Sequence, residues 1–113
     1  KPRQILWRIY SRRAILCAGA TERPIAFENN DRPGIMMAGA VRSYINRWAA
    51  APGKRIAIFT NNDDGLRTEA DLRAKGIEVA AVIDSRKGGM VTGSSGRLGL
   101  TGITVRGSRA DAR

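Results

Sequence analysis

The sequence contains no histidine, a single cysteine and few aromatic residues, which make up 5% of its 113 residues. The absence of histidine excludes a histidine-based catalytic triad, a histidine metal site and an imidazole general base within this chain. The single cysteine, Cys17, excludes an internal disulfide, a Cys-x-x-Cys redox pair and a zinc site with several cysteines. Because Cys17 lies unpaired in an apolar run, we expect a reducing compartment such as the cytoplasm.

Long hydrophobic runs are also missing, so we expect no segment of the chain to span a membrane. No apolar segment follows the basic start, as it would in a secretory signal. The length corresponds to one small domain at most. The first residue is Lys1 rather than Met, and no helix cap or strand lead-in follows it. We therefore expect a fragment of a longer protein, which need not catalyse the parent protein's reaction by itself.

Basic residues outnumber acidic residues by 20 to 10, for a net charge of +10. The excess lies at the two ends, since residues 1–13 have five basic residues and no acid, and residues 97–113 have four basic residues and one acid. Nucleic-acid modules interleave aromatic side chains with their basic residues, but only Trp7 and Tyr10 lie among these charges. We therefore expect solvated or interdomain arginines, and nucleic-acid binding is the less favoured alternative.

The first third of the chain predicts a β-hairpin followed by a turn. Apolar residues alternate and then run together over residues 5–17, with a polar break at Ser11-Arg12-Arg13, which is typical of a hairpin whose second strand is buried. That strand ends at the small residues Ala18-Gly19-Ala20. Turn-forming residues then fill positions 28–34 and include the pair Pro33-Gly34.

The middle of the chain predicts one helix and then a strand–helix–strand unit. Apolar residues recur at helical spacing over residues 35–50, and Pro52-Gly53 ends that helix. The apolar run 54–59 predicts a strand that is covered on both faces. A helix over Leu66–Lys75, with Asn62, Asp63 or Asp64 as its cap, connects it to a second buried strand at Ile77–Ile83. We expect a shared core formed by Val41, Ile45, Trp48, Ile56, Ile58, Phe59, Leu66, Val79 and Val82.

The predicted fold class is therefore α/β: a Rossmann-like βαβ unit with parallel strands, preceded by one helix and an N-terminal β-hairpin. Glycine and serine are frequent over residues 85–99, which predicts a mobile loop. Residues 100–105 predict one further short strand. The tail from residue 107 has few apolar residues, so we expect it to be disordered.

The turn after the first strand of this unit resembles a dinucleotide-binding turn that has lost two glycines. In the pattern Gly-x-Gly-x-x-Gly the three positions are Thr60, Asn62 and Gly65, so only the glycine needed for helix–strand packing is present. The side chain of Asn62 stands where the pyrophosphate would approach, and acids at 63 and 64 compete with a phosphate for the helix amides. Asp84 lies about where a ribose partner is expected. The sequence thus predicts a degenerate nucleotide site; in the alternative of a free-standing nucleotide-binding module, Asn61, Asn62, Gly65 and Asp84 are the contacts.

A second candidate lies at the end of the predicted hairpin, in Ala18-Gly19-Ala20 and Arg23. Small residues allow a ligand to approach the backbone, and Arg23 could pair with a phosphate or with an acidic partner. The other interpretation is a tight interdomain crossover in which Arg23 forms a structural ion pair. Both remain open, and no catalytic residue and no metal ligand is predicted.

Two long segments resemble the alpha subunit of heterotetrameric bacterial sarcosine oxidase: CAGATERPIAFENNDRPGIMMAGAVRSYINRW (17–48) and APGKRIAIFTNNDDGLRTEADLRAKGIEVAAVID (51–84). The most specific parts are the turn Asn30–Met36 and the turn Phe59–Asp63. The alpha subunits of dye-linked proline, opine and amine dehydrogenases share the segment Gly19–Pro24, but match the second turn less well.

This resemblance implies a flavoprotein with two dinucleotide-binding domains, similar in fold to thioredoxin reductase. Residues 1–34 would end an upstream dinucleotide-binding domain, residues 35–106 would form a pyridine-nucleotide-type domain, and residues 107–113 a disordered tail. The Ala18-Gly19-Ala20 segment would close over a dinucleotide held upstream. In this family the alpha subunit carries NAD, the beta subunit carries FAD and the amine site, and FMN lies between them.

The family further implies gamma and delta subunits as partners and a parent enzyme that oxidises sarcosine to glycine and formaldehyde. Oxygen receives the electrons, and tetrahydrofolate accepts the one-carbon unit. The chain by itself would be catalytically inert. The alternatives are a related FAD-dependent proline, opine or amine dehydrogenase, a free-standing nucleotide-binding module, and a basic scaffold that docks partner subunits through its arginine-rich ends.

Overall fold

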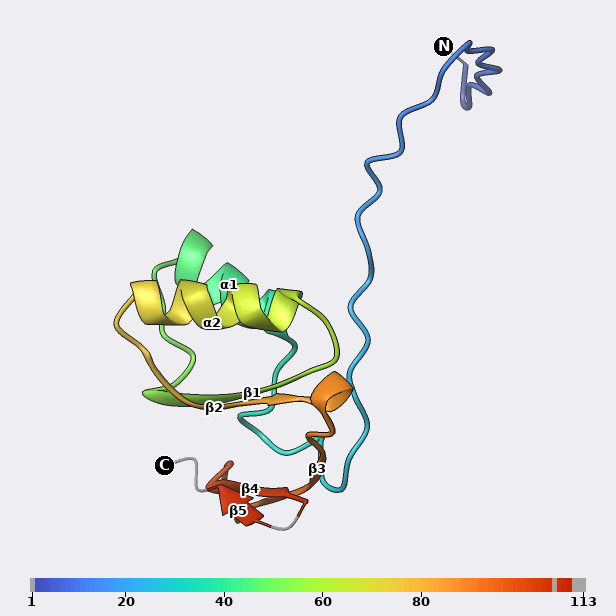
Figure 1. Ribbon diagram of the computed structural model, residues 1–113. Helices are drawn as coiled ribbons and strands as arrows, with labels where there is room; N and C mark the ends of the chain where they lie inside the picture. The colour runs from blue at the N-terminus through green and yellow to red at the C-terminus, as the bar shows by residue number, and fades with distance from the viewer. Residues whose placement is uncertain (1, 107, 111–113) are drawn as a thin grey trace.

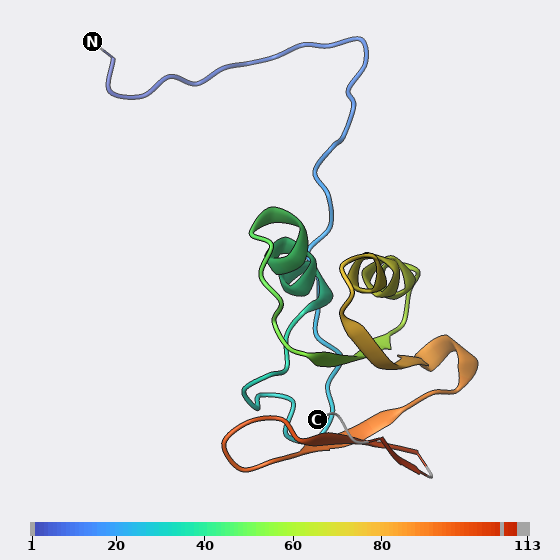
Figure 2. The same cartoon turned by 90° about the vertical axis from the view of Figure 1, so that its left-hand side faces the viewer.

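The computed structural model describes residues 2–106 and 108–110. Its elements are α1 (Ala38–Arg47), β1 (Arg55–Thr60), α2 (Asp64–Ala74), β2 (Glu78–Asp84), the 3-10 helix η1 (Ser85–Lys87), β3 (Val91–Ser95), β4 (Gly102–Val105) and β5 (Ser108–Ala110). The two α-helices lie over one face of the β1–β2 sheet, and the β3–β4–β5 sheet lies against the other face (Figures 1 and 2). The predicted α/β class is confirmed.

The strands β1 and β2 pair in parallel, as the strand–helix–strand pattern predicted. Ile56 is opposite Val79 and Ala57 is opposite Ala81, so the register shifts by one residue at Ala80. A parallel pair needs a crossover on one face of the sheet, and α2 provides it (Figure 1). Among the described strands, β2 is the only one that pairs with β1.

Both faces of the β1–β2 sheet are covered, which explains why its strands are apolar without alternation. The helix-side cluster has Val41, Ile45, Ile58 and Leu72 at its centre. The second cluster lies between the two sheets and has Ile83, Val91 and Ile103 at its centre. Phe59 belongs to this second cluster, where its ring meets that of Phe27 edge to face at 6.0 Å.

Two predicted core residues lie at the surface instead. Leu66 is 42% exposed and Trp48 is 60% exposed. Leu66 lies in the first turn of α2, and Trp48 is the residue that follows the last residue of α1. Leu72, which was not among the expected core residues, is instead the completely buried leucine of α2.

The expectation of a mobile loop over residues 85–99 is wrong. Val91–Ser95 form β3, which pairs antiparallel with β4, the strand that the sequence predicted. Gly93 lies against Glu28, and the amide of Ser94 donates to the carbonyl of Glu28 at 3.0 Å. A small residue at 93 lets this backbone come close, so the glycine marks a packed strand rather than a loop.

β5 falls within the tail that was expected to be disordered, and it pairs antiparallel with β4. The backbone of Ser108–Ala110 is therefore ordered as a strand. The remainder of the predicted tail, residues 107 and 111–113, lies outside the described residues.

The N-terminal β-hairpin is also wrong, because residues 2–26 form neither strand nor helix. They run as an extended arm away from the two sheets (Figures 1 and 2). Tyr10 and Leu16 are 92% and 91% exposed, and Cys17 is exposed rather than buried in a strand. An isolated two-stranded hairpin is marginal in water, since it needs a third strand or a helix to cover its apolar face. Nothing within the described residues covers this one.

Within the described part of the chain, no helix has both the length and the apolarity that crossing a membrane requires.

Candidate functional site

The turn between β1 and α2 closes on itself. The Thr60 hydroxyl accepts a hydrogen bond from the backbone amide of Asn62 at 3.2 Å, and it donates to the carbonyl of Asn62 at 3.0 Å. The side-chain oxygen of Asn62 accepts from the amide of Asp64 at 3.0 Å. Asn62 thus caps the start of α2, whereas Asp63 makes no side-chain cap. Two amides of this turn, those of Asn62 and Asp64, therefore already have partners within the chain, although a dinucleotide-binding turn offers such amides to a pyrophosphate.

Gly65 has the packing role that the sequence assigned to it. It is buried at the first turn of α2, directly against Thr60. A Cβ at position 65 would lie 2.6 Å from Cγ2 of Thr60 and still closer to its Cβ and hydroxyl. The close approach of α2 to β1 therefore requires glycine at this position.

Asp84, the candidate ribose partner, is occupied by Arg86. The guanidinium of Arg86 donates to both carboxylate oxygens, with Nη2 2.8 Å from Oδ2 and Nε 3.0 Å from Oδ1. The amide of Arg86 donates to the same carboxylate at 3.0 Å. Nη1 of Arg86 also donates to Asp63 at 2.8 Å, which ties the end of β2 to the start of α2.

These contacts shift the pKa of both partners. The hydrogen bonds from Arg86 lower the pKa of Asp84 below its usual value, against the opposing effect of burial. The carboxylates of Asp84 and Asp63 raise the pKa of Arg86 further above its usual value. The Asp84 carboxylate is therefore paired with Arg86 in this structure rather than free to accept a hydrogen bond from a ribose.

We expect this pair to make the stability of the chain depend on acid pH. Because the folded-state pKa of Asp84 is lowered, its contribution is complete above the ordinary aspartate pKa of about 3.9 and is lost as the pH falls through the lowered value. In Arg86→Gln that contribution disappears, so the free energy of unfolding should rise less steeply between about pH 2 and pH 5. Urea unfolding at a series of pH values measures this slope.

Lys87→Gln is the matched control, because Lys87 acts on Asp84 only through its charge, whereas Arg86 donates hydrogen bonds to Asp84. Its slope should remain near that of the unmodified chain. Equal slopes for Arg86→Gln and the unmodified chain would show that the pair does not govern the acid response.

A groove of about 1010 Å³ brings five of the eight predicted site residues together. It runs along β1 between the segment that leads into the first sheet (residues 18–28, called the entering segment below), the start of α1 and the turn after β1. Its wall includes Ala20, Arg23, Asn61, Asn62 and Gly65. Ala18 and Gly19 lie on the exposed arm outside this wall. Arg23 is exposed and forms no ion pair within the described part of the chain, so the proposed structural pair is absent there.

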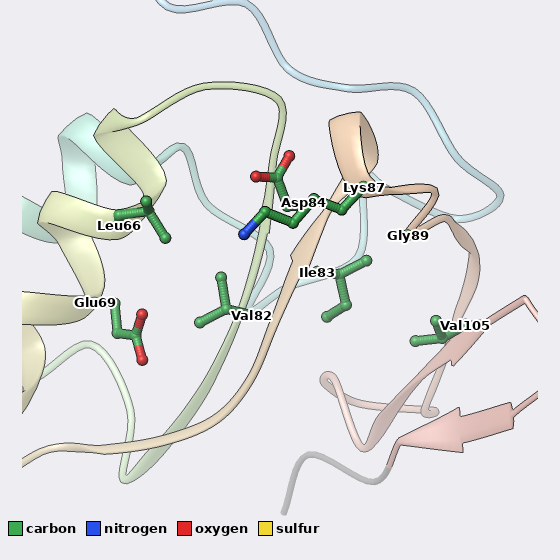
Figure 3. A pocket seen from close by; sticks show the side chains of 8 residues that line it. All are labelled: Leu66, Glu69, Val82, Ile83, Asp84, Lys87, Gly89 and Val105. Atoms are coloured by element: carbon green, nitrogen blue, oxygen red, sulfur yellow. The ribbon is translucent and has the colours of Figure 1, made fainter.

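Asp84 lies elsewhere, in a smaller pocket of about 430 Å³. Figure 3 shows it at the end of β2 beside Lys87, with Leu66 and Glu69 of α2 across from them. The structure therefore separates Asp84 from the other candidate residues. Across residues 2–106 and 108–110, no group of three acidic, cysteine or histidine side chains is placed to hold a metal ion.

Two residues that organise this region were missed by the sequence analysis. Arg86 forms an ion pair with the Asp84 carboxylate, and Glu22 accepts hydrogen bonds from the first two amides of α1. A signal for Glu22 did exist: Met37, the residue before α1, offers no side-chain cap, so the first amides of the helix need an acceptor from another part of the chain. No comparable signal in the sequence predicts the role of Arg86, apart from its position two residues after Asp84, the acid that ends β2.

Comparison with known proteins finds no matching family model. Among curated proteins, sarcosine oxidase subunit alpha from Rhizobium meliloti (strain 1021) is 53% identical over 85 residues, which are 75% of this chain and 9% of that protein. The subunit alpha from Corynebacterium sp. (strain U-96) is 44% identical over 97% of this chain and 12% of its own length. The chain thus spans about a tenth of the length of the curated relatives it matches.

Among solved structures, the crystal structure of L-proline dehydrogenase from P. horikoshii matches with a TM-score of 0.65 over 84% of this chain and 19% of that chain. Its sequence identity is 24%, so this likeness concerns the fold alone. The sequence matches cover both turns that carried the resemblance. This chain is therefore similar to one segment of the sarcosine oxidase alpha subunits, and the resemblance seen in its residues is confirmed.

Proposed function

We propose that this chain is the Rossmann-like unit of the alpha subunit of an amine-oxidising enzyme similar to sarcosine oxidase. The observation that carries the proposal is the identity of 44% over 97% of the chain to one such subunit, with 53% over a shorter stretch to another. The parent enzyme would convert sarcosine to glycine and formaldehyde, with oxygen as the electron acceptor and folate as the acceptor of the one-carbon unit.

Within that enzyme we assign the chain a structural rather than a catalytic role. Side chains of the turn itself accept hydrogen bonds from the amides of Asn62 and Asp64, and Arg86 pairs with Asp84. These contacts support the view that NAD is held by an upstream unit, with FAD and FMN elsewhere in a cytoplasmic complex with beta, gamma and delta subunits. Asn61, Asn62, Gly65 and Asp84 would then bind no nucleotide.

The entering segment is the part of this chain that we propose to approach a cofactor. Ala18, Gly19 and Ala20 carry small side chains, and Arg23 has an unpaired guanidinium at the groove. Small residues allow a dinucleotide to come close to the backbone, and a guanidinium pairs well with phosphate oxygens. The arginine-rich arm ahead of them is available for contact with partner subunits.

A second candidate is a dehydrogenase acting on proline or a related amine, favoured by the fold shared with an L-proline dehydrogenase. Sequence identity favours sarcosine, since it is 53% and 44% for the sarcosine oxidase alpha subunits and 24% for the proline enzyme.

The test is to assemble the whole alpha subunit that contains this segment with its partner subunits and to measure amine-dependent oxygen uptake and, in parallel, amine-dependent reduction of an electron-accepting dye. We expect uptake with sarcosine and little with proline. Activity with proline alone would transfer the assignment to the second candidate, and activity with neither would remove it. Hydride transfer to or from NAD by the isolated chain would contradict the structural role.

A further inference from the structure

The first turn of α1 holds a carboxylate from a distant part of the chain. The amide of Ala38 donates to Oε1 of Glu22 at 2.9 Å, and the amide of Gly39 donates to Oε2 at 2.8 Å. Glu22 precedes these residues by 16 and 17 positions, so the contact depends on the path of the chain. The preceding residue, Met37, has no side chain that could cap the helix.

The hydrogen bonding of this helix start is complete only with Glu22. An α-helix leaves its first amides without partners inside the helix. The amides of Ala40 and Val41 reach the carbonyl of Met37 at 3.0 and 3.1 Å. The two amides that remain are those that Glu22 takes, and a carboxylate also suits the positive end of the helix dipole.

Gly39 makes room for this carboxylate. A Cβ at position 39 would lie 2.7 Å from Oε2 of Glu22, so the end of the flexible Glu22 side chain would have to move away from the helix start. Glycine is a poor residue within a helix, where alanine is preferred. Its presence at the second position of α1 is explained by the space that the carboxylate needs.

Glu22 is also the anchor of the entering segment. Among described residues ahead of Phe27, it alone forms a hydrogen bond or ion pair to the rest of the chain. Its neighbours Ala20 and Arg23 line the groove beside β1, together with Ala38 and Gly39. Without this contact, no polar interaction in the described structure would hold Arg23 at the groove wall.

We infer that Glu22 is a positioning residue: its carboxylate fastens the entering segment to α1 and thereby holds Ala20 and Arg23 at the groove. Gly39 contributes to this arrangement, because its lack of a side chain leaves room for the Glu22 carboxylate. This inference concerns the chain itself and does not depend on which reaction the parent enzyme catalyses.

The test uses the 113-residue chain and four variants: Glu22→Gln, Glu22→Ala, Gly39→Ala and the double variant Glu22→Ala/Gly39→Ala. Amide exchange at Ala38 and Gly39, and 15N relaxation of residues 20–25, are measured by NMR. We expect faster exchange and greater mobility of the segment in both Glu22 variants and in Gly39→Ala. The resonances of α2 and β2 show whether the body is still folded.

Thermal unfolding supplies a second, independent readout. In the Glu22→Ala background, Gly39→Ala should raise the unfolding midpoint, because alanine is the better helix former. In the unmodified chain the same change should fail to raise it, because the new methyl group displaces the carboxylate. Glu28→Gln, an exposed carboxylate on the same segment, is the control and should leave exchange at Ala38 and Gly39 unchanged.

Two results would overturn the inference. One is unchanged mobility of residues 20–25 when Glu22 is replaced. The other is an equal rise of the midpoint with Gly39→Ala in both backgrounds, which would mean that the carboxylate and the glycine are not coupled.

Discussion

Replacing Leu72 by alanine is expected to lower the free energy of unfolding by about 2–5 kcal/mol. Leu72 is completely buried at the centre of the helix-side cluster, where α2 meets Val41, Ile45 and Ile58. The loss combines the transfer of apolar surface with the cavity that the shortened side chain leaves. Total stability in small domains is only about 5–15 kcal/mol, so the variant should unfold at a much lower urea concentration.

Leu66→Ala is the matched control, because it makes the same chemical change six residues earlier on the same helix. Leu66 is 42% exposed, so its replacement should cost about 1 kcal/mol or less. Urea unfolding followed by circular dichroism measures both variants. A larger loss for Leu66→Ala than for Leu72→Ala would show that α2 presents a different face to the sheet.

The second large effect concerns nucleotide binding at the turn after β1. We expect the unmodified chain to show no saturable NMR shifts at Thr60–Gly65 with NAD up to about 1 mM, since weaker binding corresponds to less than about 4.1 kcal/mol. The physical reason is that Thr60 and Asn62 accept hydrogen bonds from two amides of the turn, those of Asn62 and Asp64, and that Arg86 pairs with Asp84. Saturable shifts below this concentration would instead favour a free-standing nucleotide-binding module.

A variant in which the contacts of the turn and of Asp84 are removed (the reopened variant) provides a positive test of this expectation. Thr60→Gly and Asn62→Gly restore the pattern Gly-x-Gly-x-x-Gly with Gly65, and Arg86→Gln frees the carboxylate of Asp84. We expect at least a tenfold gain in NAD affinity, about 1.4 kcal/mol, with shifts at the turn and at Asp84. Asn61→Gly adds a glycine at the adjacent position without freeing an amide, so it should show no gain.

Inorganic pyrophosphate, titrated in parallel, separates the effects of the turn from those of the ribose site. It should respond to the two glycine changes but not to Arg86→Gln. Circular dichroism checks that the reopened variant is folded. If a folded triple variant gains no affinity, occupation of the turn by its own side chains is not what prevents binding.

The strand–helix–strand unit could be predicted from the sequence because its signals are local. The apolar runs before Thr60 and Asp84 marked β1 and β2, since strands covered on both faces carry no polar alternation. The absent glycines at positions 60 and 62 already indicated that the turn had lost the openness that a diphosphate needs. Gly65 was assigned its packing role correctly for the same local reason.

Sequence patterns within one segment gave wrong predictions where the secondary structure or burial depends on contact with another part of the chain. The alternation over residues 5–17 describes a segment that could bury one face, but a strand also needs an edge to pair with. The glycines and serines near residue 93 are typical of a loop. These residues nevertheless form β3, because Glu28 pairs with one side of the strand and β4 with the other. Exposure of Leu66 and burial of Leu72 depend on how α2 sits on the sheet.

The sequence alone determined the parallel βαβ unit and the degeneracy of its turn, because caps, apolar runs and missing glycines act between near neighbours in the chain. Only the tertiary structure decided that Glu22 completes α1 and that Arg86 joins Asp84 to Asp63. The contacts of Glu22 with α1 and of Arg86 with Asp63 link positions 16 to 23 residues apart. Hydrogen bonds act over about 3 Å, so which charged groups meet depends on the folded path of the chain.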